Sequence, residues 1–387
     1  MELQSLEKKV SALFESKFNQ QPQLISSAPG RINIIGEHTD YNLGLSMPAA
    51  INRWVIVCFA WRNDNIVKVA SESYNNEMVY TIGQSFTPSD SWMKFIYGAL
   101  EIFQRTNKMD KGFNAFVWGN VPLGAGVSSS AAVEVSFMNL LRMAYKSPMT
   151  DVEAVKNCQK IEHEYIGVKS GLLDQYASLF SKAGKLMKLD FNSLTHEYSD
   201  ADMGNWCWVL ANTKVKRELS GSKYTERVNE TQEGLKWLTT NNPKIKGFRD
   251  ITINDVETIQ NPVVKKRLKH FVLENARVDL LAKAFAAKNI QEVGRILYEG
   301  HTSLQVDYEV SCDELDYLVE LAKKFDGCAG ARMMGGGFGG CTINLLKKEK
   351  LADFSTYILS NYKQKFNIDS EIYAFDVVDG AACKPTT

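Results

Sequence analysis

Apolar positions at the start of the chain recur at helical spacing and predict an amphipathic helix over residues 1–18. Two runs rich in apolar residues follow at residues 24–28 and 54–60, and we expect both to be strands. Residues 30–50, between these runs, are polar and contain glycine, which predicts a long loop. The apolar positions of the first helix are Leu3, Leu6, Val10, Leu13 and Phe14.

The pattern then alternates between extended and helical segments. Residues 68–81 predict a hairpin, residues 92–104 a helix and residues 113–118 another strand. A glycine turn and three serines separate this strand from a dense apolar run at residues 131–146, which predicts a buried helix. Strand, glycine turn and helix in this order form an arrangement that binds phosphate groups.

Helical patterns dominate the rest of the chain. We expect a helix at residues 151–164 that is capped by Asp151, and a strand at residues 186–191. A glycine cluster at residues 335–340 precedes another strand-like run. Helices and strands alternate irregularly, which favours an α+β fold over a regular doubly wound sheet. The long helical patterns of the second half are residues 224–238, 264–288, 290–304 and 312–325.

Length and composition indicate a globular chain with two domains. The 387 residues exceed one ordinary hydrophobic core, and we place the boundary near residue 195, between domains 1–195 and 196–387. A hydrophobic fraction of 44% and a charged fraction of 23% exclude disordered, collagenous and coiled-coil proteins. The 45 basic and 45 acidic side chains cancel, so we expect no nucleic-acid or membrane partner, and any anionic ligand must be bound locally.

The cysteines and the N-terminus favour a cytoplasmic protein. Seven cysteines without a CxxC pair argue against a disulfide framework or a zinc knuckle. The first 18 residues carry Glu2 and Glu7 and lack the basic start and apolar run of a signal peptide. No uncharged apolar run is long enough to predict a transmembrane span.

The glycine turn before the helix at residues 131–146 is the first candidate site. Glycines let backbone N–H groups approach an anion, and a helix N-terminus adds unpaired donors, so we expect a polyphosphate here. The segment is neither a Walker A loop nor a dinucleotide fingerprint, because no GK[ST] follows and Ser129 occupies the place of the third glycine. A serine-capped helix after a tight turn is the alternative. The candidate phosphate-binding residues are Gly124, Ala125, Gly126, Val127, Ser128, Ser129 and Ser130.

A magnesium ion would fit the same helix start. Serine hydroxyls beside phosphates ligate magnesium together with one or two carboxylates, and Glu162 is a candidate partner for Ser130. A single glutamate on a helix is most often solvated, which is the alternative. His163 is not part of a zinc motif, because Gly167 stands where HExxH needs its second histidine.

The predicted loop at residues 30–50 carries an unusual density of polar groups. Arg31, Glu37, His38 and Asp40 lie within a few residues of one another, which suits a polyol ligand, because sugar hydroxyls need fixed donors and acceptors. Arg31 has a second possible role, the stabilisation of charge on a transferring phosphoryl group. The alternative for the segment is a solvated turn capped by Asp40.

Two further segments complete the candidate chemistry. Asp174 follows Gly171 and two leucines, and it is either a base that orients a substrate hydroxyl or a helix cap. The glycine cluster at residues 335–340 is a second phosphate-facing nest, a flexible lid or a plain loop. Together with the phosphate loop, these features favour phosphoryl transfer from a nucleotide.

Three motifs, in this order along nearly the whole chain, resemble the GHMP small-molecule kinase superfamily and, within it, the galactokinase family. Residues 27–42, SAPGRINIIGEHTDYN, resemble the galactokinase signature; residues 123–132, LGAGVSSSAA, resemble the phosphate loop; and residues 335–341, GGGFGGC, resemble the third motif. Residues 301–316 also resemble the galactokinase pattern. Broader members such as mevalonate and homoserine kinases differ where GEHTDYN stands. Met334 departs from the threonine or serine usual in the family, which puts a hydroxyl contact there in doubt.

The resemblance implies an α+β fold of two lobes, the N-terminal lobe with a mixed sheet and helices and the C-terminal lobe with a ferredoxin-like core. It implies transfer of the γ-phosphoryl group of ATP to the C1 hydroxyl of D-galactose, with Mg²⁺, by a protein we expect to be monomeric. The intact phosphate loop and Asp174 favour catalysis over the alternative of a non-catalytic galactose sensor. A kinase of another sugar, such as N-acetylgalactosamine, is the second alternative.

The resemblance also implies a role for each candidate residue. Asp174 would be the catalytic base with Arg31 beside it, and Ser130 and Glu162 would hold magnesium. The phosphate loop would bind ATP. Residues implied to bind galactose are Glu37, His38, Asp40, Gly171 and Tyr224.

Overall fold

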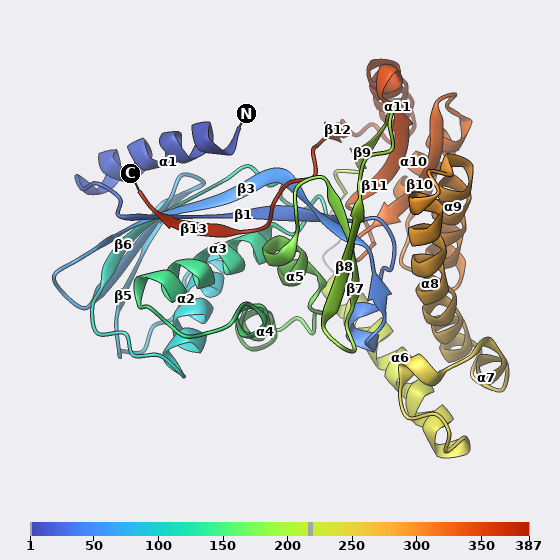
Figure 1. Ribbon diagram of the computed structural model, residues 1–387, viewed down its shortest axis with the longest axis horizontal. Helices are drawn as coiled ribbons and strands as arrows, with labels where there is room; N and C mark the ends of the chain where they lie inside the picture. Colours follow the sequence, from blue (N-terminus) through green and yellow to red (C-terminus); the bar gives the residue numbers. More distant parts are fainter. Residues whose placement is uncertain (1, 216–219, 387) are drawn as a thin grey trace.

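The computed structural model describes residues 2–215 and 220–386. Within these ranges the strands form a long mixed sheet, a four-stranded antiparallel sheet and a small three-stranded sheet (Figure 1). The helices are α1 (Leu3–Phe18), α2 (Ser91–Gln104), α3 (Ser129–Ala144), α4 (Asp151–Ile161), α5 (Leu173–Phe180), α6 (Ser220–Asn241), α7 (Ile253–Glu257), α8 (Pro262–Ala286), α9 (Ile290–Val306), α10 (Asp313–Lys324) and α11 (Leu351–Phe366). None of the helices within the described ranges combines the length and apolarity needed to cross a bilayer.

The long sheet has the strand order β13-β1-β3-β6-β4-β5, in which β4 and β6 are parallel. The second sheet has the order β10-β11-β9-β12, and the third β2-β7-β8. The strands are β1 (Leu24–Asn33), β2 (Leu45–Ser46), β3 (Pro48–Trp61), β4 (Ile66–Ser71), β5 (Tyr74–Thr81), β6 (Phe113–Gly119), β7 (Lys185–Asp190), β8 (Thr195–Asp200), β9 (Trp206–Asn212), β10 (Cys328–Met334), β11 (Cys341–Lys347), β12 (Glu371–Ala374) and β13 (Ala382–Pro385).

The central strands of the long sheet are buried on both faces. Because side chains alternate along a strand, β3 sends Ile56 and Cys58 to the face covered by α1 and Val55 and Val57 to the opposite face. Figure 1 shows α1 on one side of this sheet and α2 to α5 on the other. Phe14 of α1 is fully buried, and such a side chain contributes about 1.5–3 kcal/mol when removed from water.

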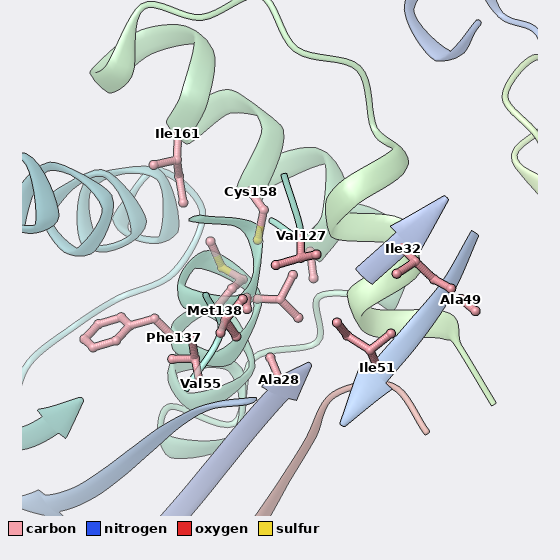
Figure 2. Close-up of a cluster of buried hydrophobic side chains, with 14 of the residues drawn as sticks. Ala28, Ile32, Ala49, Ile51, Val55, Val127, Phe137, Met138, Cys158 and Ile161 are labelled. Atoms are coloured by element: carbon pink, nitrogen blue, oxygen red, sulfur yellow. The ribbon is translucent and has the colours of Figure 1, made fainter. Parts of the chain in front are cut away.

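The larger core fills the space between this sheet and the helices that follow the phosphate loop. Figure 2 shows Ala28, Val55 and Ile51 of the sheet facing Phe137 and Met138 of α3. All five side chains are buried. This packing fixes the start of α3 against β1, where the candidate site lies.

The second sheet has the ferredoxin-like arrangement that the resemblance implied. Its strands occur in the chain order β9, β10, β11 and β12, and β9 lies between β11 and β12, with helices before β10 and between β11 and β12. Figure 1 shows α8 and α9 side by side next to this sheet. The expected α+β fold is therefore confirmed. The boundary near residue 195 stays a prediction, and β13 at the end of the chain pairs with β1 in the first sheet.

The structure corrects two local predictions. Residues 30–50 are not one loop, because β1 continues to Asn33 and β3 already begins at Pro48. Buried strand positions tolerate these polar residues where their side chains face the cavity described below. The helix at residue 151 is capped by Thr150 instead of Asp151, since the extended Thr150 accepts a hydrogen bond from the backbone N–H of Glu153.

Candidate functional site

A polar cavity of about 240 Å³ lies among residues 27–42, called the sugar-signature segment below, α5, α6 and the loop after β10. It gathers residues more than 300 positions apart in the chain, including eight that the sequence singled out. Those eight are Arg31, Glu37, His38, Asp40, Glu162, Gly171, Asp174 and Tyr224. The other lining residues are Asn33, Val168, Ser170, Leu173, Gly335 and Gly336.

Asp174, in the first turn of α5, is held by Arg31 of β1. Arg31 donates to Asp174 Oδ1 from Nε at 2.8 Å and from Nη2 at 2.6 Å. Its Nη1 donates to the carbonyl of Gly126 at 2.5 Å, and the hydroxyl of Ser128 donates to Asp174 Oδ2. Arg31 and Ser128 therefore connect the carboxylate directly to the phosphate loop.

The phosphate loop presents the start of α3 to the site. Gly124 and Gly126 adopt φ values of 72° and 73°, which glycine allows without steric cost. Ser128, the N-cap of the 16-residue α3, makes no side-chain hydrogen bond to the first turn. The first N–H groups of the helix thus lack a side-chain cap, and an anion is a suitable acceptor.

Ser130 and Glu162 approach each other at the edge of the polar cavity. Their Oγ and Oε1 atoms lie 3.5 Å apart, and Ser170 donates to the other carboxylate oxygen. Burial raises the pKa of Glu162 to about 7. A hydroxyl and a single carboxylate beside a phosphate loop are oxygen donors of the kind that magnesium accepts when it keeps water and phosphate ligands. Among the described residues, no group of three or more His, Cys, Asp or Glu side chains is arranged to hold a metal by itself.

Asp40 forms the opposite wall together with Gly171. Burial and the nearby charge of Asp174 raise the pKa of Asp40 to about 6. A Cβ atom on Gly171 would lie 1.7 Å from Asp40 Oδ2, so only glycine leaves room for this carboxylate.

His38 and three tyrosines form an aromatic cluster on the same side. His38 Nδ1 lies 2.9 Å from the hydroxyl of Tyr41, which lies 2.6 Å from the hydroxyl of Tyr308. The rings of His38 and Tyr224 lie 5.4 Å apart. Burial lowers the pKa of His38 to about 3, so its ring is neutral. Its Nε2 has no hydrogen-bond partner among the residues that the structure describes and can hydrogen-bond a ligand.

Glu37 belongs to a buried charge network that the sequence did not reveal. Arg332 of β10 forms ion pairs with Glu37 and with Glu274 of α8, the latter at 3.2 Å. Glu274 also accepts from the backbone N–H of Gly36 at 2.9 Å, and Glu37 accepts from that of Gly335 at 3.2 Å. The network therefore ties the sugar-signature segment to α8 and to the glycine cluster.

The two carboxyl groups of this network have opposite pKa shifts. Desolvation raises the pKa of Glu37 to about 7, although Arg332 opposes it. Desolvation acts on Glu274 as well, but the charges of Arg332 and Arg277 outweigh it and hold the pKa of Glu274 well below its usual range.

A second, mostly apolar cavity of about 270 Å³ lies beside the phosphate loop. Ser129 and Ser130 form part of its wall, and so do Tyr74 and Trp92. The rings of Tyr74 and Trp92 are stacked with centroids 5.3 Å apart. Sequence reasoning missed this cavity, because its aromatic residues lie in a hairpin and a helix that carry no motif.

Comparison with known families and structures gives a consistent result. The galactokinase galactose-binding signature matches residues 12–60, and the N-terminal and C-terminal GHMP kinase domains match residues 94–182 and 281–363. The galactokinase of Bacillus subtilis is 36% identical over 386 residues, which cover 97% of this chain and 98% of that protein. The galactokinase of Fusobacterium nucleatum is 36% identical over 362 residues, which cover 92% of this chain and 93% of that protein.

The fold is similar to that of solved GHMP kinases. Lactococcus lactis galactokinase complexed with galactose superposes with a TM-score of 0.92 at 33% identity, over 98% of this chain and 99% of that one. Methanococcus jannaschii mevalonate kinase shares the fold, with a TM-score of 0.67 at 18% identity over 92% of this chain and 99% of that one. The chain belongs to the galactokinase family of the GHMP kinases.

Proposed function

We propose that this protein transfers the γ-phosphoryl group of ATP to the C1 hydroxyl of D-galactose and releases α-D-galactose 1-phosphate and ADP. The observation that carries the proposal is the position of Asp174, whose carboxylate lines the polar cavity and is joined to the phosphate loop through Arg31 and Ser128. A sugar hydroxyl in the cavity would therefore lie between the Asp174 carboxylate and the phosphates of a nucleotide bound at the phosphate loop. Membership of the galactokinase family supports galactose as the occupant.

In this proposal Asp174 is the catalytic base. It accepts the proton of the C1 hydroxyl while that oxygen attacks the terminal phosphorus. Arg31, with two donors on one carboxylate oxygen, fixes the orientation of Asp174 and offsets negative charge on the transferring group. Because phosphoryl transfer requires little covalent chemistry from the protein, positioning of the reactants and electrostatic stabilisation supply most of the rate enhancement.

The nucleotide occupies the phosphate loop and the apolar cavity beside it. Backbone N–H groups of residues 124–129 and of the first turn of α3 bind the phosphates. The stacked rings of Tyr74 and Trp92 offer an apolar wall to the purine base. Both cavities border the start of α3, so base and sugar lie on either side of the phosphates.

Ser130 and Glu162 would hold magnesium, which would supply positive charge to offset that of the phosphates. A cation also favours the ionised form of Glu162, whose pKa burial raises.

Galactose hydroxyls are bound by Glu37, His38, Asp40 and Tyr224 and by the backbone at Gly171. Asp40 is the acceptor that discriminates hydroxyl stereochemistry, because an ionised carboxylate wedged against Gly171 cannot move to follow a misplaced hydroxyl. The neutral His38 donates or accepts through Nε2.

We also propose a monomeric protein of the cytoplasm. The seven cysteines, all within the described part of the chain, form no disulfide, which suits a reducing compartment. Size-exclusion chromatography with light scattering tests the monomer.

The experiment is the substitution Asp174→Asn with a coupled assay of ADP release over galactose, glucose, N-acetylgalactosamine, mevalonate and homoserine. The wild type should turn over galactose and reject glucose by up to about 10⁴-fold. Asp174→Asn, whose amide cannot accept the proton, should abolish turnover while nucleotide binding measured by calorimetry persists. Asp202→Asn, in an exposed turn, is the control. Near-normal turnover of Asp174→Asn would remove Asp174 from the mechanism.

A further inference from the structure

Asn33, the last residue of β1, is a polar group in the cavity that no role above uses. Its side chain is 2% exposed and lines the same cavity as Arg31, two residues earlier on the same face of the strand. Within residues 2–215 and 220–386, neither Oδ1 nor Nδ2 of Asn33 has a hydrogen-bond partner. Its backbone N–H donates to Met334 Sδ at 3.3 Å.

Backbone contacts on both sides hold Asn33 in this position. β1 pairs with β3 up to the register Asn33–Pro48, and Met334 at the end of β10 holds the backbone from the other side. Buried polar groups in native proteins are nearly always hydrogen-bonded. An amide that is buried with both ends unsatisfied therefore points to a partner that arrives with the ligand.

The donor and acceptor atoms of the Asn33 amide determine which ligand groups can hydrogen-bond it. Nδ2 needs an acceptor and Oδ1 needs a donor, and sugar hydroxyls supply both. Oxygens of an ionised phosphate accept only, so they would satisfy Nδ2 and leave Oδ1 without a partner.

The strand fixes which part of the sugar Asn33 reaches. Arg31 contacts Asp174, at the reacting end of the cavity. A strand rises about 3.3 Å per residue, so Asn33 lies roughly 7 Å further along β1. This distance places the amide at a hydroxyl other than the one that is phosphorylated.

We propose that Asn33 is a specificity-determining residue that hydrogen-bonds a non-reacting hydroxyl of the hexose. The inference rests on the proposed function, since it requires galactose in this cavity. Asn33 adds an uncharged group that both donates and accepts hydrogen bonds to the charged and aromatic groups around the sugar.

The test combines Asn33→Ala with a series of deoxygalactoses that lack the hydroxyl at C2, C3, C4 or C6. For galactose, kcat/KM should fall about 10- to 100-fold in the variant, the range for one lost hydrogen bond to a buried group. For one of the four deoxy sugars the wild type and the variant should differ by less than about threefold, because the hydroxyl that Asn33 contacts is already missing. KM for ATP should stay within about threefold of wild type.

Asn344→Ala is the matched control, because Asn344 is also buried with an unpartnered Oδ1 but lies on β11 outside the polar cavity. It should lower the melting temperature and leave all four deoxy penalties as in wild type. Asn33→Ser, a smaller polar change, serves if the alanine variant does not fold.

Equal variant-to-wild-type ratios for galactose and all four deoxy sugars would overturn the inference, because they show that Asn33 contacts no hydroxyl of the sugar. A change confined to KM for ATP would overturn it as well. If the wild type releases no ADP with galactose, the proposed function fails and the inference fails with it. If it does release ADP, but the variant loses as much activity with every deoxy sugar as with galactose, only the inference fails.

Discussion

Arg332→Met tests whether the buried charge network stabilises the packing of the sugar-signature segment against α8 and β10. Arg332 is fully buried between Glu37 and Glu274, and its Nη1 also donates to the carbonyl of Ile34 at 3.1 Å. Methionine fills much of the same space but leaves two carboxyl groups without the cation that they share. Glu274 keeps its ion pair with Arg277, but Glu37 is left buried without its ion-pair partner.

The expected loss of stability is large. Removing one partner of a buried ion pair costs about 3–5 kcal/mol. At an unfolding entropy of about 2.1 cal/mol/K per residue, a cooperative unit of 387 residues converts this loss to a fall in Tm of roughly 4–6 °C. A lobe that unfolds by itself carries less entropy and shifts further, so about 4 °C is the lower bound.

The pH dependence gives the loss a signature. Glu37 has a folded pKa raised to about 7, so its contribution to stability is present below its usual value of 4.5 and is lost as the pH rises through 7. Without Arg332, which lowers this pKa, the folded value rises further. The stability deficit of the variant should therefore grow between pH 6 and pH 9, which are assay values chosen around that pKa.

Calorimetric melting of four proteins completes the assay: wild type, Arg332→Met, Glu274→Gln and the double variant. The double variant should be more stable than the sum of the single losses predicts, by about 0.5–3 kcal/mol. Arg295→Met is the control, because Arg295 makes ion pairs with Glu292 and Glu299 on the exposed face of α9, where such pairs contribute at most about 1 kcal/mol. Equal losses for Arg332→Met and Arg295→Met, or additive losses in the double variant, would refute the reasoning.

Two further predictions concern the proposed sugar site. Gly171→Ala should raise KM for galactose about 10- to 100-fold without changing KM for ATP, because the new Cβ would occupy the position of the Asp40 carboxylate. Gly247→Ala, where a Cβ meets nothing within 4 Å, is the control, and an unchanged KM for galactose in Gly171→Ala would contradict the role of Asp40. Independently, kcat/KM for galactose at saturating ATP should rise from pH 5 and level off above about pH 7, because the Asp40 carboxylate, with its pKa raised to about 6, must be ionised to accept sugar hydroxyls. A rise centred near 3.8, the usual value for aspartate, would show that the environment of Asp40 does not govern sugar binding.

The elements of the chain were predictable where one periodicity extends over many residues. The helices α1, α2, α3 and α8 lie within a few residues of their predicted ranges, because their buried faces produce the pattern. Strand β1 was predicted to end at residue 28, because Arg31 and Asn33 are polar although buried. Polar residues favoured a loop over a strand in the sequence, and the structure places these two side chains on a strand that lines the polar cavity.

The site was predictable in its composition but not in its connections. The residue patterns singled out Arg31 and Asp174 separately, and only the resemblance placed Arg31 beside Asp174. The fold brings the two residues together across 143 positions and shows that they form an ion pair. Arg332 and Glu274 gave no signal at all, because a single arginine on a strand and a single glutamate on a helix are ordinary surface residues in most sequences. In the fold both residues are fully buried and contact the sugar-signature segment. A sequence pattern does not reveal the burial of isolated charged residues.

For the glycine cluster at residues 335–340 the sequence left three interpretations open: a phosphate-facing nest, a flexible lid or a plain loop. A Cβ on Gly337 would lie 2.2 Å from the carbonyl of Val310, so glycine is required there for close approach of two backbones. The N–H of Gly335 donates to Glu37, and a Cβ on Gly335 would lie 3.3 Å from the carbonyl of Gly126 in the phosphate loop. The cluster therefore packs against both the sugar-signature segment and the phosphate loop. Movement of this segment would therefore disturb the proposed sugar and nucleotide sites together.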